Sequence, residues 1–173
     1  MTLKEVDLKT LDLNPFTAIG DDWMLITAGD AASHNTMTAS WGGLGVLWNS
    51  PVATCYIRQS RYTKEFVDAA DTFTLSFFDP EKYRKQLAYL GRVSGRDEDK
   101  VAEAGLEPVA VDGTTTFAEA RLTLVCRKAY SAYLGPEGFV DGSDDDADFY
   151  SGADKGDYHT MYIGKIERAY VAE

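Results

Sequence analysis

The sequence predicts a mainly β fold, a closed or nearly closed antiparallel barrel with a few short helices. Six or more segments carry the alternating or branched apolar patterns that are typical of strands, whereas three carry helical spacing. These strands and helices do not alternate regularly along the chain, which argues against a doubly wound parallel sheet. The length of 173 residues fits one domain that spans residues 1–173.

The strand predictions rest on two kinds of pattern. In residues 35–41 and 72–78, successive side chains alternate in character with a period of two, which places one set on each face of a strand. The other segments are runs rich in apolar, branched and aromatic residues. These runs are residues 23–29, 52–58, 121–130 and 158–171.

Three helices are expected from their capping residues and apolar spacing. The first begins near Ser60, a candidate N-cap. The second begins at Asp79, with Pro80 at the first helical position and Gly91 as its terminator. The third is short and covers residues 97–103.

The charge balance excludes several classes of partner. The chain has 17 Lys and Arg against 28 Asp and Glu, a formal net charge of -11, so we expect no nucleic-acid partner and no anionic membrane partner. About half of this charge lies in residues 141–157, which hold seven Asp and one Lys. Because the rest of the chain is only mildly acidic, a local basic pocket for an anion remains compatible with the sequence.

The cysteines and the N-terminus indicate an intracellular setting. Cys55 and Cys126 lie in separate apolar runs and form no CxxC pattern, so we expect buried, reduced thiols. Residues 1–7 are too charged for a signal peptide, and no window approaches 18 uncharged apolar residues. We therefore expect a cytoplasmic protein.

A basic segment at residues 58–64 is the first candidate binding site. Three of its seven residues are basic, and it lies where a strand gives way to a helix, whose N–H groups favour phosphate. Ser60 and Thr63 can add hydroxyl donors, and Arg58 or Arg61 can bind phosphate oxygens in a fork. A solvated helix start that Ser60 caps is an equally good interpretation.

Two further segments and one histidine can be read in two ways. Residues 94–96, Ser-Gly-Arg, form a loop suited to an anion or simply precede a helix that Asp97 caps. Residues 36–43 place hydroxyls and glycines around Trp41, which suits a flat aromatic ligand or an ordinary strand and turn. His159 can be a hydrogen-bond donor, a proton relay near physiological pH or a satisfied surface histidine. It forms no metal-spaced pair with His34, so we expect no metal site.

Taken together, in this order and spacing, these segments resemble the flavin reductase-like family, and most closely its flavoredoxin-type branch. The resemblance runs over nearly the whole chain and implies an antiparallel FMN-binding split β-barrel with short helical decorations. It is carried by residues 35–45 (NTMTASWGGLG), 51–53 (PVA), 58–63 (RQSRYT), 71–78 (DTFTLSFF), 94–97 (SGRD), 120–128 (ARLTLVCRK) and 156–166 (GDYHTMYIGKI).

The resemblance also implies a homodimer with FMN bound non-covalently at or near the subunit interface. Backbone and hydroxyl groups of residues 38–41 would meet the flavin ring and ribityl chain, and the 58–63 turn, aided by residues 94–96, would hold the phosphate. His159 would lie near the flavin or the nicotinamide as a candidate catalytic residue, and Lys64 and Lys100 are weaker phosphate candidates. The expected cofactor-binding residues are Thr36, Thr38, Ala39, Ser40, Trp41, Arg58, Gln59, Ser60, Arg61, Tyr62, Thr63, Ser94, Gly95 and Arg96.

Three functions follow from these expectations. The first is an FMN-dependent oxidoreductase, in which NADH or NADPH passes a hydride to the flavin, which then reduces free flavin, a small-molecule redox substrate or a redox partner protein. The second is an FMN-binding electron carrier without efficient NAD(P)H oxidation, whose acidic segment docks a basic redox partner. The third is a barrel that binds another flat or phosphorylated ligand, such as haem, or serves as a structural interaction module.

Overall fold

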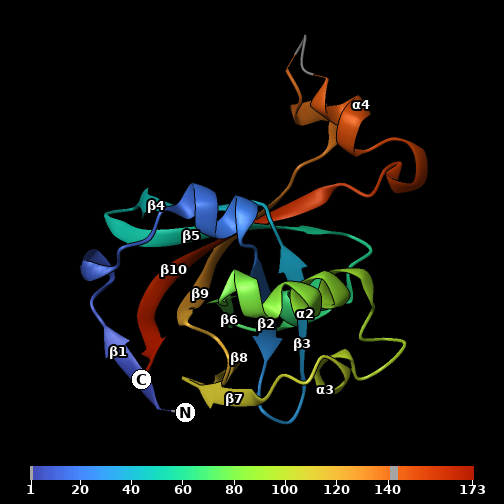
Figure 1. The fold of residues 1–173 in the computed structure, drawn as a ribbon. Helices are drawn as coiled ribbons and strands as arrows, with labels where there is room; N and C mark the ends of the chain where they lie inside the picture. Colours follow the sequence, from blue (N-terminus) through green and yellow to red (C-terminus); the bar gives the residue numbers. More distant parts are fainter. Residues whose placement is uncertain (1, 141–143) are drawn as a thin grey trace.

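The structure, a computed structural model, describes residues 2–140 and 144–173. An antiparallel sheet of eight strands dominates it, in the order β3-β2-β6-β9-β10-β5-β4, with β1 paired to β10 (Figure 1). The mainly β, antiparallel architecture expected from the sequence is confirmed. The strands are β1 (Leu3–Val6), β2 (Met24–Gly29), β3 (His34–Ala39), β4 (Gly42–Leu47), β5 (Ser50–Arg58), β6 (Thr72–Phe77), β9 (Leu122–Tyr133) and β10 (His159–Ala172). A separate two-stranded sheet consists of β7 (Pro108–Val111) and β8 (Thr114–Phe117).

The barrel is split between two strands that follow each other in the chain. β3 and β4 stand at opposite ends of the strand order, and within the described residues they are not paired with each other. Only Ser40 and Trp41 join them. A large aromatic side chain therefore lies at the seam where the sheet fails to close.

Two apolar cores hold the sheet in this shape. The interior of the barrel contains fully buried side chains from several strands, including Phe73, Phe77 and Tyr162. A second cluster, which includes Leu25 and Leu87, lies between the sheet and helix α2 (Pro80–Arg92). This second cluster fixes the end of α2, which the candidate site uses.

The helices agree with the predicted caps in part. α2 begins as expected, because the Asp79 side chain accepts the Glu81 N–H at 3.0 Å and Pro80 takes the first helical position. It continues through Gly91 to Arg92. α1 (Tyr62–Ala69) begins later than predicted, with Arg61 rather than Ser60 as its N-cap residue. α3 covers only Lys100–Glu103, because Asp99 caps it by accepting the Ala102 N–H.

The sequence does not predict the β4–β5 and β7–β8 hairpins. β4 is rich in glycine, which is depleted in strands, and the sequence predicts only a turn at its first two residues, Gly42 and Gly43. It pairs with β5 through a tight turn in which Trp48 and Asn49 both have positive φ. The β7–β8 hairpin turns at Asp112-Gly113, a dipeptide that favours such turns and could have revealed it.

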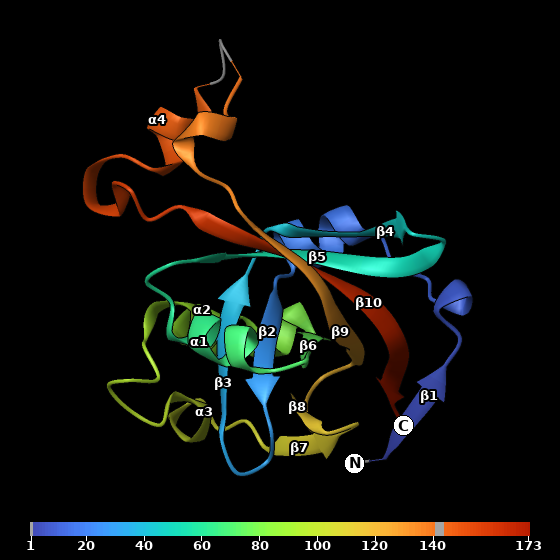
Figure 2. The same cartoon turned by 180° about the vertical axis from the view of Figure 1, so that it is seen from behind.

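An arm projects from the body where β9 and β10 run beyond the rest of the sheet (Figures 1 and 2). We call residues 134–140 and 144–158 the acidic arm. It contains η3 (Pro136–Gly138), α4 (Asp145–Phe149) and η4 (Gly152–Asp154). Residues 141–143 of the predicted acidic segment lie outside the described residues.

Two further expectations concern the thiols and the membrane. Cys55 and Cys126 are free and fully buried, as predicted, and burial raises the pKa of the Cys55 thiol to about 12. Within residues 2–140 and 144–173, no helix combines the length and the hydrophobicity needed to cross a membrane.

The close approach of strands to the core at Gly164 gives a stability prediction. A Cβ at this position would lie 2.7 Å from Phe73 Cζ and 2.8 Å from Cys126 Cβ. We expect Gly164→Ala to lower the free energy of unfolding by about 1–3 kcal/mol through overpacking, measured by chemical denaturation. Gly45→Ala is the matched control, because a Cβ there meets nothing within 4 Å. Equal effects of the two substitutions would contradict the tight packing at Gly164.

Candidate functional site

Two adjoining cavities lie beside the split of the barrel. The smaller, of about 170 Å³, is lined by Trp41, His159 and the last residues of β3, and we call it the aromatic cavity. The larger, of about 400 Å³, lies among the ends of β5, α2 and α3 and the start of α1, and we call it the basic cavity. Met37, Arg58 and Arg61 line both, so the two cavities lie side by side.

The aromatic cavity combines flat side chains with hydroxyl groups. Thr38, Ala39, Ser40 and Trp41 all line it, as the sequence analysis anticipated for a flat ligand. The Thr38 hydroxyl donates to the Leu87 carbonyl at 2.5 Å, which ties the end of β3 to α2. Trp41 is 41% exposed and lines the cavity, where it offers an apolar surface. Tyr56 is a lining residue that the sequence analysis missed.

His159 lies at the start of β10, opposite Arg58 of β5, and is buried. Its ring centroid is 5.1 Å from that of Trp41, and its Nδ1 is 2.6 Å from the Tyr150 hydroxyl. Burial and the positive charge of Arg58 lower the pKa of His159 to about 4. The ring is therefore neutral near pH 7, so a proton relay near physiological pH does not fit this environment. A neutral ring whose Nδ1 accepts the Tyr150 proton carries its own proton on Nε2.

The basic cavity gathers cations from four separate elements. They come from the end of β5, the N-cap of α1, the last turn of α2 and the start of α3, and two arm carboxylates face them. The cations are Arg58, Arg61, Arg92 and Lys100, and the carboxylates are Asp154 and Asp157. Such an excess of positive charge suits an anion with more than one negative charge.

Two of these cations are held by the C-terminal carbonyls of α2. The buried Lys100 ammonium donates to Leu90 O at 3.0 Å and to Val93 O at 2.9 Å. The Arg61 guanidinium donates to Gly91 O at 2.7 Å. Burial, with Arg61 nearby, lowers the pKa of Lys100 to about 8. Lys100, a weaker phosphate candidate from the sequence, is thus engaged in a structural contact.

Arg92 differs from the other cations. Among residues 2–140 and 144–173, its guanidinium finds no hydrogen-bond or ion-pair partner, and Arg92 is exposed while it lines the basic cavity. The sequence assigns Arg92 to no site, because Gly91 is predicted to end the helix. Its position, directly after a predicted C-terminus and two residues before Ser94, was the available signal.

The start of α1 forms the floor of the same cavity. Tyr62 and Thr63, its first two residues, line the cavity, and Arg61 provides no side-chain cap for the helix. The first N–H groups of a helix lack intrahelical acceptors and favour an anion. Asn35 donates to the Thr63 hydroxyl oxygen at 2.8 Å, which ties α1 to β3. Ser60, Thr63 and Ser94 supply hydroxyl groups around this point.

The acidic arm already contacts this end of the site. Ser60 donates its backbone N–H to Asp157 Oδ1 at 2.9 Å and its hydroxyl to Asp157 Oδ2 at 2.5 Å. Arg58 donates to the carbonyls of Asp157 and Phe149 at 3.2 and 3.0 Å, and its Nη2 lies 3.7 Å from an Asp154 carboxylate oxygen. The Arg58 guanidinium also lies over the Tyr150 ring. The arm therefore covers one side of the basic cavity.

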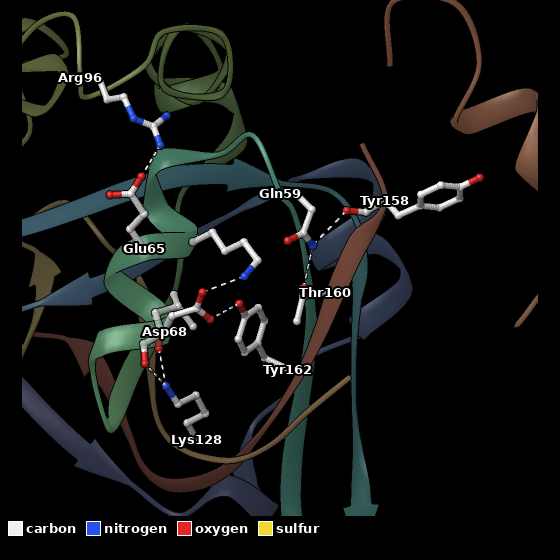
Figure 3. Close-up of polar contacts among 10 residues, drawn as sticks. Gln59, Glu65, Asp68, Arg96, Lys128, Tyr158, Thr160 and Tyr162 are labelled. Carbon is white, nitrogen blue, oxygen red and sulfur yellow. Dashed lines mark hydrogen bonds and ion pairs between the residues drawn. The ribbon is translucent and has the colours of Figure 1, made fainter. Parts of the chain in front are cut away.

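Several predicted residues lie away from both cavities. Thr36 is fully buried, and its hydroxyl is 2.8 Å from that of Thr27. Gln59 donates to the Thr160 hydroxyl at 2.8 Å and to the Tyr158 carbonyl (Figure 3). Lys64 forms an ion pair with Asp68 at 2.7 Å. These three side chains therefore contact other protein groups, and they line neither cavity.

Gly95 and Arg96 line a neighbouring cavity of about 480 Å³ on the other side of Tyr62. Arg96 is ion-paired with Glu65 (Figure 3), and its guanidinium lies 4.6 Å from the centroid of the Tyr62 ring. Of the predicted Ser94-Gly95-Arg96 loop, Ser94 alone lines the basic cavity.

Comparison with known proteins identifies a matching family model and solved structures of the same fold. Residues 18–173 match a family model described as a flavin reductase like domain. The FMN-binding domain of a flavin reductases-like enzyme from Shewanella baltica superposes with a TM-score of 0.67 at 16% identity, covering 98% of this chain and 77% of that one. Flavoredoxin of Desulfovibrio vulgaris gives 0.66 at 22% identity, covering 98% and 78%. Nitrilotriacetate monooxygenase component B from Bacillus cereus gives 0.66 at 14% identity, covering 100% and 83%.

These structures share the fold of this chain, and the predicted antiparallel split barrel is confirmed. No curated protein sequence matches the chain.

The neutral state of His159 can be tested directly. In a His34→Gln variant, His159 is the one remaining histidine, so its ring signals can be followed by NMR. We expect a titration midpoint near pH 4, well below the ordinary value of about 6.5. Because the folded-state pKa is lowered, protonation favours the unfolded chain, and this contribution to stability is lost as pH falls from about 6.5 toward 4. A midpoint near 6.5 would contradict the buried, cation-flanked environment.

Proposed function

Since this chain belongs to the flavin reductase-like family, we propose that it is an FMN-dependent oxidoreductase that takes a hydride from NADH or NADPH. One observation carries the proposal: a cavity with a flat aromatic wall adjoins a cavity lined by four cations, and three residues line both. A ligand for both needs a flat ring at one end and an anionic group at the other. FMN has this form, with its ring and its phosphate joined by the ribityl chain.

The residues present fit FMN at both ends. The two cavities, of about 170 and 400 Å³, share three lining residues, and together they are of the size that small-molecule sites require. Arg61, Arg92 and the start of α1 would hold the phosphate through charge-assisted hydrogen bonds. Trp41 and the hydroxyls of Thr38 and Ser40 would contact the ring and the chain attached to it.

The chemistry divides between the cofactor and the protein. FMN, when bound, would supply the redox chemistry, since its ring can accept a hydride and pass electrons to an acceptor. The protein would bind and orient the ring against Trp41 and shield it from water. His159, neutral and oriented by Tyr150, would offer a hydrogen bond without bringing a charge to the site. Hydride transfer itself requires no acid or base from the chain.

An FMN-binding electron carrier is the second candidate function, and the acidic arm favours it. The arm projects from the body, and the first turn of α4 holds three Asp residues (Figure 1). Such a surface would attract a basic redox partner, with an association rate that falls steeply as salt is added. The two functions differ in how fast a reduced nicotinamide reduces the bound flavin.

We also propose that the protein acts as a homodimer. Phe16 in η2 (Phe16–Asp21) is 86% exposed, and Val46 and Trp48 in the β4–β5 hairpin are 77% and 51% exposed. η2 contacts β4 and lies beside this hairpin (Figure 1), so the two elements that carry these apolar side chains are neighbours. A second copy would cover them. Sedimentation equilibrium should then report twice the chain mass of 19.1 kDa, and a single-chain mass would reject the dimer.

Absorbance spectroscopy tests the proposed function. The protein is mixed with FMN, freed of excess ligand, and then treated with NADH or NADPH without oxygen. A retained two-banded flavin spectrum that bleaches rapidly supports the reductase. A retained spectrum that stays coloured supports the carrier, and absence of any flavin spectrum overturns both.

Arg92 provides a site-specific prediction. We expect Arg92→Ala to weaken FMN binding by roughly 10- to 100-fold, the loss of one charge-assisted hydrogen bond, and to leave riboflavin binding unchanged because riboflavin has no phosphate. Lys85→Ala is the matched control, since it removes one exposed cation from the same helix away from both cavities. Titration calorimetry measures both ligands. Unchanged FMN affinity in Arg92→Ala would remove Arg92 from the phosphate site.

A further inference from the structure

We propose that Asp157 competes with the flavin phosphate for the same end of the site, which makes FMN an exchangeable ligand of this protein. The inference rests on the proposed binding of FMN. It names one residue of the acidic arm as a determinant of affinity for the phosphorylated flavin over the unphosphorylated one.

The Asp157 carboxylate occupies hydrogen-bond donors at one end of the basic cavity. Both of its oxygens accept hydrogen bonds from one residue, Ser60, at 2.9 Å from the backbone N–H and 2.5 Å from the hydroxyl. A backbone N–H and a hydroxyl that precede a helix are the donors that a phosphate group also uses. Asp157 thus presents an anion to donors of the basic cavity, which both Ser60 and Asp157 line.

The acidic arm also binds Arg58. This guanidinium donates to the carbonyls of Asp157 and Phe149, and Asp154 lies 3.7 Å away. The arm therefore uses one of the four cations of the cavity as well as the donors of Ser60. Arg61 and Lys100 are held by α2, which leaves Arg92 as the cation without a protein partner among the described residues.

A phosphate that enters the basic cavity meets the negative charge of Asp157. A phosphate monoester carries between one and two negative charges near pH 7 and would lie beside the Asp157 carboxylate. Two anions at one set of donors repel each other, so the phosphate must displace the carboxylate or bind less tightly beside it. On release of FMN, Asp157 can return to Ser60, which satisfies the donors again and favours dissociation.

The test compares Asp157→Asn with the wild type. The substitution keeps the shape of the side chain and removes its charge. We expect it to tighten FMN binding by roughly tenfold, equivalent to about one pKa unit of interaction, and to slow FMN release in stopped-flow fluorescence. Riboflavin affinity should not change. Asp148→Asn is the control, because it removes the same charge from an exposed position on the same arm and should leave both affinities at the wild-type value.

Asp157→Ala removes both the charge and the hydrogen-bonding group. It should shift the FMN affinity in the same direction, and it replaces the first variant if Asp157→Asn fails to fold. FMN affinity in both variants at or below the wild-type value overturns the competition, while the proposed function stands if the wild type binds FMN. Equal tightening by Asp148→Asn also overturns it, since overall charge would then be the cause. If neither flavin binds to any of the proteins, the proposed function and this inference both fail.

Discussion

The C-terminal carbonyls of α2 are the contact on which the candidate site depends. Four cations in one cavity repel each other, so negative potential nearby is needed to hold them together. Lys100 and Arg61 donate to three of these carbonyls, where the helix dipole is negative. The interaction offsets the cost of burying Lys100 and joins the starts of α1 and α3 to the end of α2. Arg92, in the last turn of the same helix, is thereby placed at the cavity.

The two ends of the site differ in how they are built. The aromatic end belongs to the split itself, since Ser40 and Trp41 are the short link between β3 and β4. The basic end is assembled by helix termini and is partly covered by the acidic arm. Tyr150 and Asp157 connect the arm to both ends, through His159 and Ser60 respectively. The arm is therefore a part of the site as well as a projection from the barrel.

Local patterns predicted much of this structure, and long-range contacts account for what they missed. Alternation in 35–41 and 72–78 identified β3 and β6, and the Asp79-Pro80 pair located the start of α2. The glycines of β4 carry no strand signal, because their pairing with β5 and not their propensity makes them a strand. The cluster of Arg58, Arg61 and Thr63 at one cavity followed from their closeness in sequence. The contact of Asp157 with Ser60, 97 positions apart, left no local pattern.

The burial of both cysteine thiols affects how readily peroxide can oxidise them. A protein that handles reduced flavin, as proposed here, works close to the peroxide that forms when reduced flavin meets oxygen. Peroxide attacks the thiolate, and its rate follows the thiolate fraction and the access of the sulfur. Cys55 and Cys126 are out of reach of solvent, and burial raises the pKa of both thiols, so they stay protonated. The two thiols of the barrel interior would in this way resist the peroxide that the proposed chemistry releases.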